Sequence, residues 1–271
     1  MYFYLVDNFL NDKRYEKIFT KIENRIIDLG INGRITKLSL LKSAAELVKE
    51  EVKRGAKTIV AVGNDKIVSQ IINVIAEQDL TFGIIPVGEN NQIAELLGIP
   101  YNEAACDILS ARRIEHLDLG KVNQNYFLFK AQIKSPEVVL DSENQYNINL
   151  LSKNNQITIY NLAAEGELKK ISPKQKNYTC FNPQDGILEL IVNSDNKSGQ
   201  SFLKIFSWAK RKDSALILAK NISFFPIKTI NIRSKESVPV ILDQYIVTKT
   251  PAQVSVLPKA LKIIVGKGRV F

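Results

Sequence analysis

The chain has 271 residues, of which 45% are hydrophobic and 24% charged, which is typical of globular protein and long enough for two domains. No run approaches the ~18 consecutive apolar residues that a membrane-spanning helix requires, and the apolar start is too short for a signal peptide, so we expect a cytoplasmic protein without an integral membrane segment. The net charge is +9, and it lies entirely beyond residue 113, because the first 113 residues carry equal numbers of acidic and basic side chains.

Few side chains suit a metal cage or a disulfide framework. The two cysteines, Cys106 and Cys180, lie far apart and have no neighbours at metal-ligand spacing. His116 is the only histidine, which excludes a site with several histidine ligands. We expect structural roles for all three.

Strand and helix patterns alternate in the first part of the chain. Unbroken apolar runs predict strands covered on both faces, and apolar residues at helical spacing predict amphipathic helices, the second of them with Ser39 as N-cap. Short connections then favour a three-layer α/β domain with a parallel sheet over residues 1–115. In order, we expect strand 3–6, helix 15–26, helix 39–52, strand 58–62, helix 67–75, strand 81–87 and a short helix 91–97.

The pattern changes beyond the first domain. Short β-rich runs, several with alternating polar and apolar residues, predict an antiparallel β-sandwich domain over residues 116–271. Residues 202–212 mix aromatic and basic side chains, but this segment fits an amphipathic helix better than a nucleic-acid platform. The expected strands are 157–162, 186–192, 215–218, 228–233, 239–242, 253–256 and 261–265.

Two junctions carry a glycine just after an apolar strand. Gly63 follows the strand at 58–62, and Gly88 follows the strand at 81–87. Ligands of open α/β sheets bind outside the carboxyl ends of the strands, where glycine lets backbone N–H groups approach a phosphate. Either glycine is also compatible with a tight turn alone.

Together the two junctions resemble the signature loops of the diacylglycerol kinase catalytic domain, which has an NAD-kinase-like fold. The family has Gly-Gly-Asp-Gly-Thr at the first loop and Pro-Leu-Gly-Thr-Gly-Asn-Asp-Phe-Ala at the second. This chain has Val62-Gly-Asn-Asp-Lys66 and Pro86-Val-Gly-Glu-Asn-Asn-Gln-Ile-Ala94. The resemblance continues through residues 118–127, 183–189, 240–245 and 250–261, and matches poorly over residues 128–180.

The resemblance implies a lipid kinase of phospholipid metabolism that transfers phosphate from ATP, with Mg²⁺, to the hydroxyl of a diacylglycerol-like lipid or a sphingoid base. It implies a metal-binding role for Asp185, and it places Asp243 in a segment similar to the family's Asp-Gly-Glu strand. The basic second domain could then contact an anionic membrane surface peripherally. The positions that match the family's nucleotide site are Thr36, Gly63, Asn64, Lys66, Gly88 and Asn91.

Several family residues are replaced, and the replacements weaken the expected chemistry. Asn64 stands at an aspartate of the Mg-ATP site, and a carboxylate is the usual anchor for Mg²⁺. Asp65 replaces a glycine and would repel phosphate unless Lys66 offsets it or pairs with it in solvent. Tyr245 stands where the family has its glutamate base, and a phenol is a weak base at neutral pH; Asp243, two residues away, could substitute.

Three functions therefore stay open at this point. The first is ATP-dependent lipid phosphorylation that is weak or lost. The second is a catalytically inactive pseudokinase that binds nucleotide or lipid and regulates a partner. The third is a basic protein that binds membranes or nucleic acid, with nucleic acid the less favoured of the two.

Overall fold

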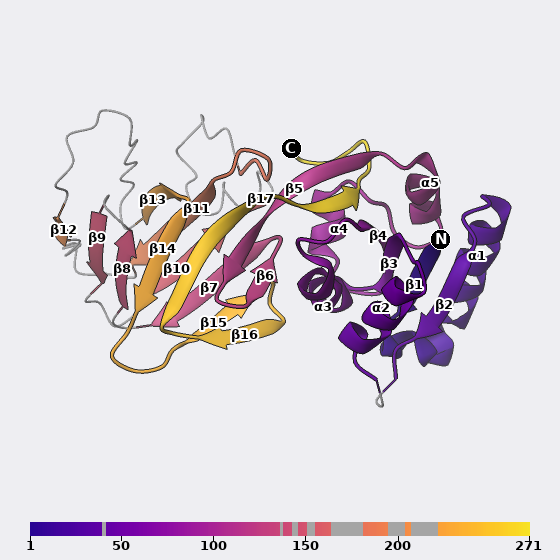
Figure 1. Ribbon diagram of the computed structural model, residues 1–271, viewed down its shortest axis with the longest axis horizontal. Coiled ribbons are helices and arrows are strands. Elements are labelled where there is room, and N and C mark those ends of the chain that lie inside the picture. Colours follow the sequence, from indigo (N-terminus) through magenta and orange to yellow (C-terminus); the bar gives the residue numbers. More distant parts are fainter. Residues whose placement is uncertain are drawn as a thin grey trace. The chain divides into compact units, whose positions relative to one another are not determined.

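The computed structural model describes residues 1–39, 42–135, 138–142, 146–150, 155–163, 181–194, 204–206 and 222–271 (Figure 1). Cys180 and the expected strand 215–218 lie outside this part. Contacts divide the chain into two compact units, Met1–Leu117 with Lys259–Val270, and Asp118–Pro258 with Phe271. No helix in the described residues is both long and apolar enough to cross a bilayer.

The first unit is built on a parallel sheet, in which the strands lie in the order β2-β1-β3-β4 and β17 pairs in parallel with β4 (Figure 1). Every residue of β3 and β4 is buried, which requires cover on both faces of the sheet. This confirms the expected parallel α/β part. The strands are β1 (Tyr2–Val6), β2 (Gly33–Lys37), β3 (Thr58–Gly63), β4 (Thr81–Pro86) and β17 (Ala252–Ile264).

Helices supply the cover. α3 packs on β3 and against α2, whereas α5 packs on β4 and against α1. The 3-10 helices η1 (Asn8–Asn11) and η2 (Lys13–Tyr15) connect β1 to α1. The α-helices are α1 (Glu16–Asp28), α2 (Ala44–Lys53), α3 (Asp65–Ile75), α4 (Gln92–Leu96) and α5 (Ala104–Ala111).

The start of α2 differs from the expectation. Ser43, and not Ser39, is the N-cap. The Ser43 hydroxyl accepts a hydrogen bond from the backbone N–H of Glu46, and the Glu46 carboxylate accepts one from the backbone N–H of Ser43. This capping box satisfies two N–H groups of the first turn at once, which a cap at Ser39 could not do.

The second unit consists of two antiparallel sheets, which confirms the expected all-β part (Figure 1). One sheet has the order β13 (Ile222–Ile227), β11 (Leu188–Ser194), β10 (Asn155–Tyr160), β7 (Lys130–Ser135), β15 (Pro239–Leu242), β16 (Ile246–Lys249). The other has β12 (Lys204–Phe206), β9 (Tyr146–Leu150), β8 (Val138–Ser142), β14 (Thr229–Arg233) and β17, which also pairs with β5 (Ile114–Val122), itself paired with β6 (Asn125–Phe127).

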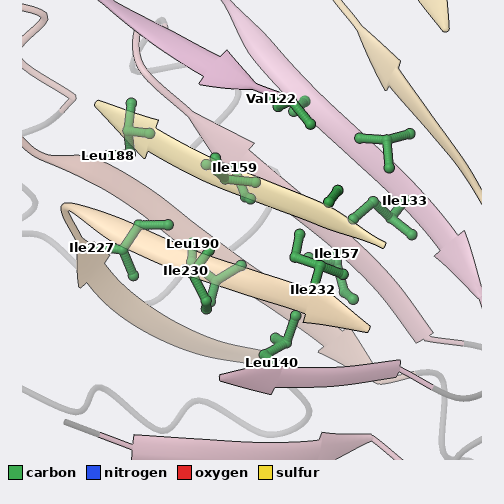
Figure 2. Close-up of a cluster of buried hydrophobic side chains, with 14 of the residues drawn as sticks. Val122, Ile133, Leu140, Ile157, Ile159, Leu188, Leu190, Ile227, Ile230 and Ile232 are labelled. Atoms are coloured by element: carbon green, nitrogen blue, oxygen red, sulfur yellow. The ribbon is translucent and has the colours of Figure 1, made fainter. Parts of the chain in front are cut away.

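The two sheets share one buried core. Ile157 and Ile159 of β10 and Ile230 and Ile232 of β14 have no exposed surface, and Figure 2 shows their side chains gathered with those of neighbouring strands. Each such side chain contributes about 2 kcal/mol when buried. The cluster therefore holds the two sheets together as a sandwich.

Two expectations for the second part were wrong. Residues 253–256 and 261–264 are not separate strands, since both lie on β17, and residues 261–265 belong to the first unit. Within residues 202–212, the described residues 204–206 form β12, which is a strand and not the expected helix.

Candidate functional site

The two glycine loops lie side by side at the carboxyl ends of β3 and β4. We call residues 63–66 loop 1 and residues 88–92 loop 2. The strands run parallel with Gly63 opposite Pro86, and the backbone N–H of Val87 donates to the carbonyl of Gly63 at 3.0 Å. Thr36 lies at the carboxyl end of β2, which is separated from β3 by β1. All six positions that match the family's nucleotide site therefore lie along the edge of the sheet that the sequence predicted.

Asp65 joins the two loops. Its carboxylate accepts hydrogen bonds from the backbone N–H groups of Gln92 at 2.8 Å and Ile93 at 3.1 Å, and its own N–H donates to the carbonyl of Asn90 at 2.9 Å. Asp65 is 2% exposed, so the expected solvated pair with Lys66 is wrong. The N–H groups at the start of α4 stabilise this carboxylate, which is therefore part of the scaffold.

Replacing Asp65 with alanine is expected to lower the stability of the first unit by about 2 kcal/mol, because two N–H groups lose their acceptor. Chemical denaturation followed by circular dichroism measures this loss. Asp79→Ala is the matched control, since the Asp79 side chain is 94% exposed and pairs only with Lys262 among the ion pairs described. Equal stability of the two variants would contradict a scaffold role for Asp65.

Asn64 and Lys66 lie at the start of α3. The Asn64 side-chain oxygen accepts a hydrogen bond from the backbone N–H of Lys66 at 3.1 Å and so caps the helix. The Lys66 side chain is exposed, and its charge is attracted to the carboxylate of Asp7. Burial raises the pKa of Asp7, while the backbone N–H groups of Asn8 and Phe9 and the charge of Lys66 lower it.

Both loop glycines are covered by side chains. A Cβ added at Gly63 would lie 2.8 Å from Cβ of Asp7, and one added at Gly88 would lie 3.1 Å from Cε2 of Phe9. The φ angles, +151° at Gly63 and +78° at Gly88, also favour glycine for the backbone alone. Neither Asp7 nor Phe9 is among the site residues expected from the sequence. The rule that ligand sites lie at the carboxyl ends of parallel strands could have identified Asp7, which directly follows β1.

Asn91 is buried in loop 2. Its side-chain N–H donates to the carbonyl of Gly88 at 2.9 Å, which holds the loop in its turn. Its side-chain oxygen has no hydrogen-bond partner among the described residues. Asn91 therefore stabilises the turn of loop 2.

In the second unit, Asp243 is bound entirely by backbone. Its carboxylate accepts hydrogen bonds from the N–H groups of Leu128, Phe129 and Lys130, each at 2.9 Å. It is 2% exposed, and burial raises its pKa to about 6 while these N–H groups lower it. The geometry is that of a carboxylate holding the start of β7.

Tyr245 and Asp185 lie in turns of the second unit. Tyr245 follows Asp243 and Gln244 in the hairpin between β15 and β16, where its N–H donates to the carbonyl of Leu242. Asp185 is exposed and accepts a hydrogen bond from the N–H of Ile187 at 2.9 Å. Partial burial raises the pKa of Asp185, the Ile187 N–H lowers it, and the charge of Asp118 raises it.

The side chains of loop 1 do not fit a Mg²⁺ site. The Asn64 oxygen is used by the helix cap, and the Asp65 carboxylate is used by loop 2. Within the described ranges, no three His, Cys, Asp or Glu side chains gather at metal-binding distance. Mg²⁺ usually needs at least one free carboxylate beside the phosphates, and loop 1 does not supply one.

Comparison with known proteins agrees with this arrangement. Residues 3–122 match the diacylglycerol kinase catalytic domain. A diacylglycerol kinase of Bacillus subtilis is 35% identical over 89 residues, which cover 31% of this chain and 29% of that protein. A candidate lipid kinase of Streptococcus pneumoniae is 23% identical over 270 residues, which cover 90% of each chain.

A crystal structure of a diacylglycerol kinase from Bacillus anthracis shows the same fold. Its TM-score is 0.74 at 18% identity, and the match covers 99% of this chain and 98% of that one. The fold comparison therefore includes both units, while the family match lies in the part that carries loop 1 and loop 2. Residues 3–122 are similar to the diacylglycerol kinase catalytic domain, and the chain is similar over most of its length to bacterial candidate lipid kinases.

Proposed function

We propose that this chain keeps the scaffold of a lipid kinase and has lost most or all of the transfer of phosphate from ATP to a lipid hydroxyl. The proposal rests on the hydrogen bonds that the Asp243 carboxylate accepts. This carboxylate stands nearest in sequence to the family's base position, and all three of its hydrogen bonds come from buried backbone N–H groups. Taking a proton from a substrate would weaken those bonds.

Tyr245 does not supply the missing base. Tyr245 stands at the base position, and a phenol accepts protons poorly at neutral pH. Loss of a general base alone typically costs 10²–10⁴ in rate. Because phosphoryl transfer depends on positioning and charge stabilisation, the absence of a free carboxylate in loop 1 adds to this loss.

The direct test is a transfer assay with labelled ATP, Mg²⁺ and micelles that contain diacylglycerol or a sphingoid base. We expect a rate at least about 10³-fold below that of the Bacillus subtilis diacylglycerol kinase measured in parallel. The double variant Asn64→Asp, Tyr245→Glu returns the family residues and is expected to raise the rate. A wild-type rate within tenfold of that of the Bacillus subtilis enzyme would contradict the proposal.

A nucleotide-binding module without catalysis is the second candidate. It is favoured by the hydrogen bonds between loop 1 and loop 2, which keep both loops folded without a ligand. Kinases of this family use ATP, so ATP is the expected ligand. Isothermal titration with ATP, with and without Mg²⁺, tests this candidate separately from catalysis, and no heat at millimolar ATP would exclude it.

A further inference from the structure

One short segment covers the glycines of both loops. Asp7 and Phe9 are two residues apart, at the end of β1 and in η1. The position of a Cβ on Gly63 lies 2.8 Å from Cβ and 3.5 Å from Oδ2 of Asp7. The same position on Gly88 lies 3.1 and 3.3 Å from Cε2 and Cζ of Phe9. We call residues 7–9 the cover segment.

The cover segment is held in place by its own backbone and by a buried anchor. The N–H of Asp7 donates to the carbonyl of Val62 at 2.9 Å, and the N–H of Leu10 donates to the carbonyl of Asp7 at 3.1 Å. Leu10 is 3% exposed and fixes η1 to the core. The Phe9 ring meets the Tyr15 ring edge-on at 5.2 Å.

The cover segment lies where a phosphate would approach the two loop glycines. A glycine at the carboxyl end of a parallel strand allows a phosphate to approach the backbone closely. At Gly88 that approach is taken by an aromatic ring, and at Gly63 by Ile67 and by the side chain of Asp7, whose carboxylate repels phosphate. The Asp7 carboxylate also attracts Lys66, the cation of loop 1.

We propose that the cover segment closes the nucleotide site from within, so that a nucleotide binds only after Phe9 leaves Gly88. This inference rests on the proposed nucleotide site and adds its regulation. Binding then requires the free energy of displacing the ring from Gly88 and Tyr15, and the apparent affinity falls by the fraction of molecules in which the site is open.

The test is isothermal titration of the full chain with ATP, in EDTA and in Mg²⁺. Phe9→Ala removes the ring and is expected to tighten ATP binding at least tenfold relative to wild type. Asp7→Asn keeps the shape of the side chain, removes its charge and is expected to tighten binding further when combined with Phe9→Ala. Tyr2→Ala is the matched control, because Tyr2 is an aromatic residue at the opposite end of β1, and it is expected to leave the affinity unchanged.

Each outcome decides the inference. If wild type and Phe9→Ala bind ATP with equal affinity, Phe9 does not block the site and the inference is wrong. If neither protein binds ATP, the proposed nucleotide site is wrong as well. An equal gain in Tyr2→Ala also overturns it, since a general loosening of the unit would then explain the effect. Thermal unfolding of each variant without ligand confirms that the first unit is folded. Lipid phosphorylation by Phe9→Ala, measured in the transfer assay, would support the cover while contradicting the proposed loss of catalysis.

Discussion

Replacing Asp243 with alanine is expected to destabilise the second unit by at least about 3 kcal/mol. The change leaves the buried N–H groups of Leu128, Phe129 and Lys130 without their acceptor, and each such group costs about 1–3 kcal/mol. Asp243→Asn is expected to cost less, because its remaining oxygen still accepts from Phe129 and Lys130. The measurement is urea denaturation followed by far-ultraviolet circular dichroism.

Asp185→Ala is the matched control for this prediction. Asp185 is an exposed aspartate of the same unit whose side chain accepts a backbone hydrogen bond from Ile187, so its loss is expected to cost only about 1 kcal/mol. If Asp243 had no structural role, Asp243→Ala would keep the stability of the wild type. A stability that falls from wild type to Asp243→Asn and again to Asp243→Ala would show that Asp243 stabilises the second unit.

Strands β1, β3 and β4 of the first unit were predictable because nearly all of their residues are buried, whereas β2, whose residues are exposed or half-buried, was not expected. Residues 59–62, for example, are all apolar, and a run of this length is typical of a parallel strand covered on both faces. The second unit was harder, because short alternating strands leave weak signals. β17 was expected as two strands because Pro258 and Lys259 separate its apolar runs, and in the structure Lys259 has a φ of +55°.

The location of loop 1 and loop 2 was predictable, but the directions of their side chains were not. Gly63 and Gly88 follow strands, and parallel neighbours end at the same edge. The partners of Asp65 lie 27 and 28 residues further along the chain, and only the tertiary structure brings them together. Phe9 reaches Gly88 through a 3-10 turn that no periodicity in the sequence indicates.

Glu189 carries the second large effect, and it depends on pH. Burial, together with the smaller effect of the charge of Asp185, raises the pKa of Glu189 from an ordinary value of 4.5 to about 8. One carboxyl oxygen of Glu189 is buried without a hydrogen-bond partner among the described residues, as suits a neutral acid. On β11, Glu189 lies opposite Tyr160 of β10.

The sign of the pH effect follows from proton binding. The folded chain binds the Glu189 proton more tightly than the unfolded chain, so this contribution to stability is complete below pH 4.5 and is lost as the pH rises toward about 8. Glu189→Gln keeps the shape and never ionises. The variant is therefore expected to match the wild type near pH 4 and to exceed it by about 1.4 kcal/mol for each further pH unit, up to about pH 8.

Urea denaturation of wild type and Glu189→Gln between pH 4 and pH 9 measures this difference. Glu236→Gln, an exposed position of the same unit, is the control. A constant difference between wild type and Glu189→Gln across the range would mean that Glu189 ionises in the folded chain as it does in the unfolded one. A growing difference would instead show that the second unit holds a neutral carboxylic acid at neutral pH, four residues from the aspartate that the family resemblance assigns to metal binding.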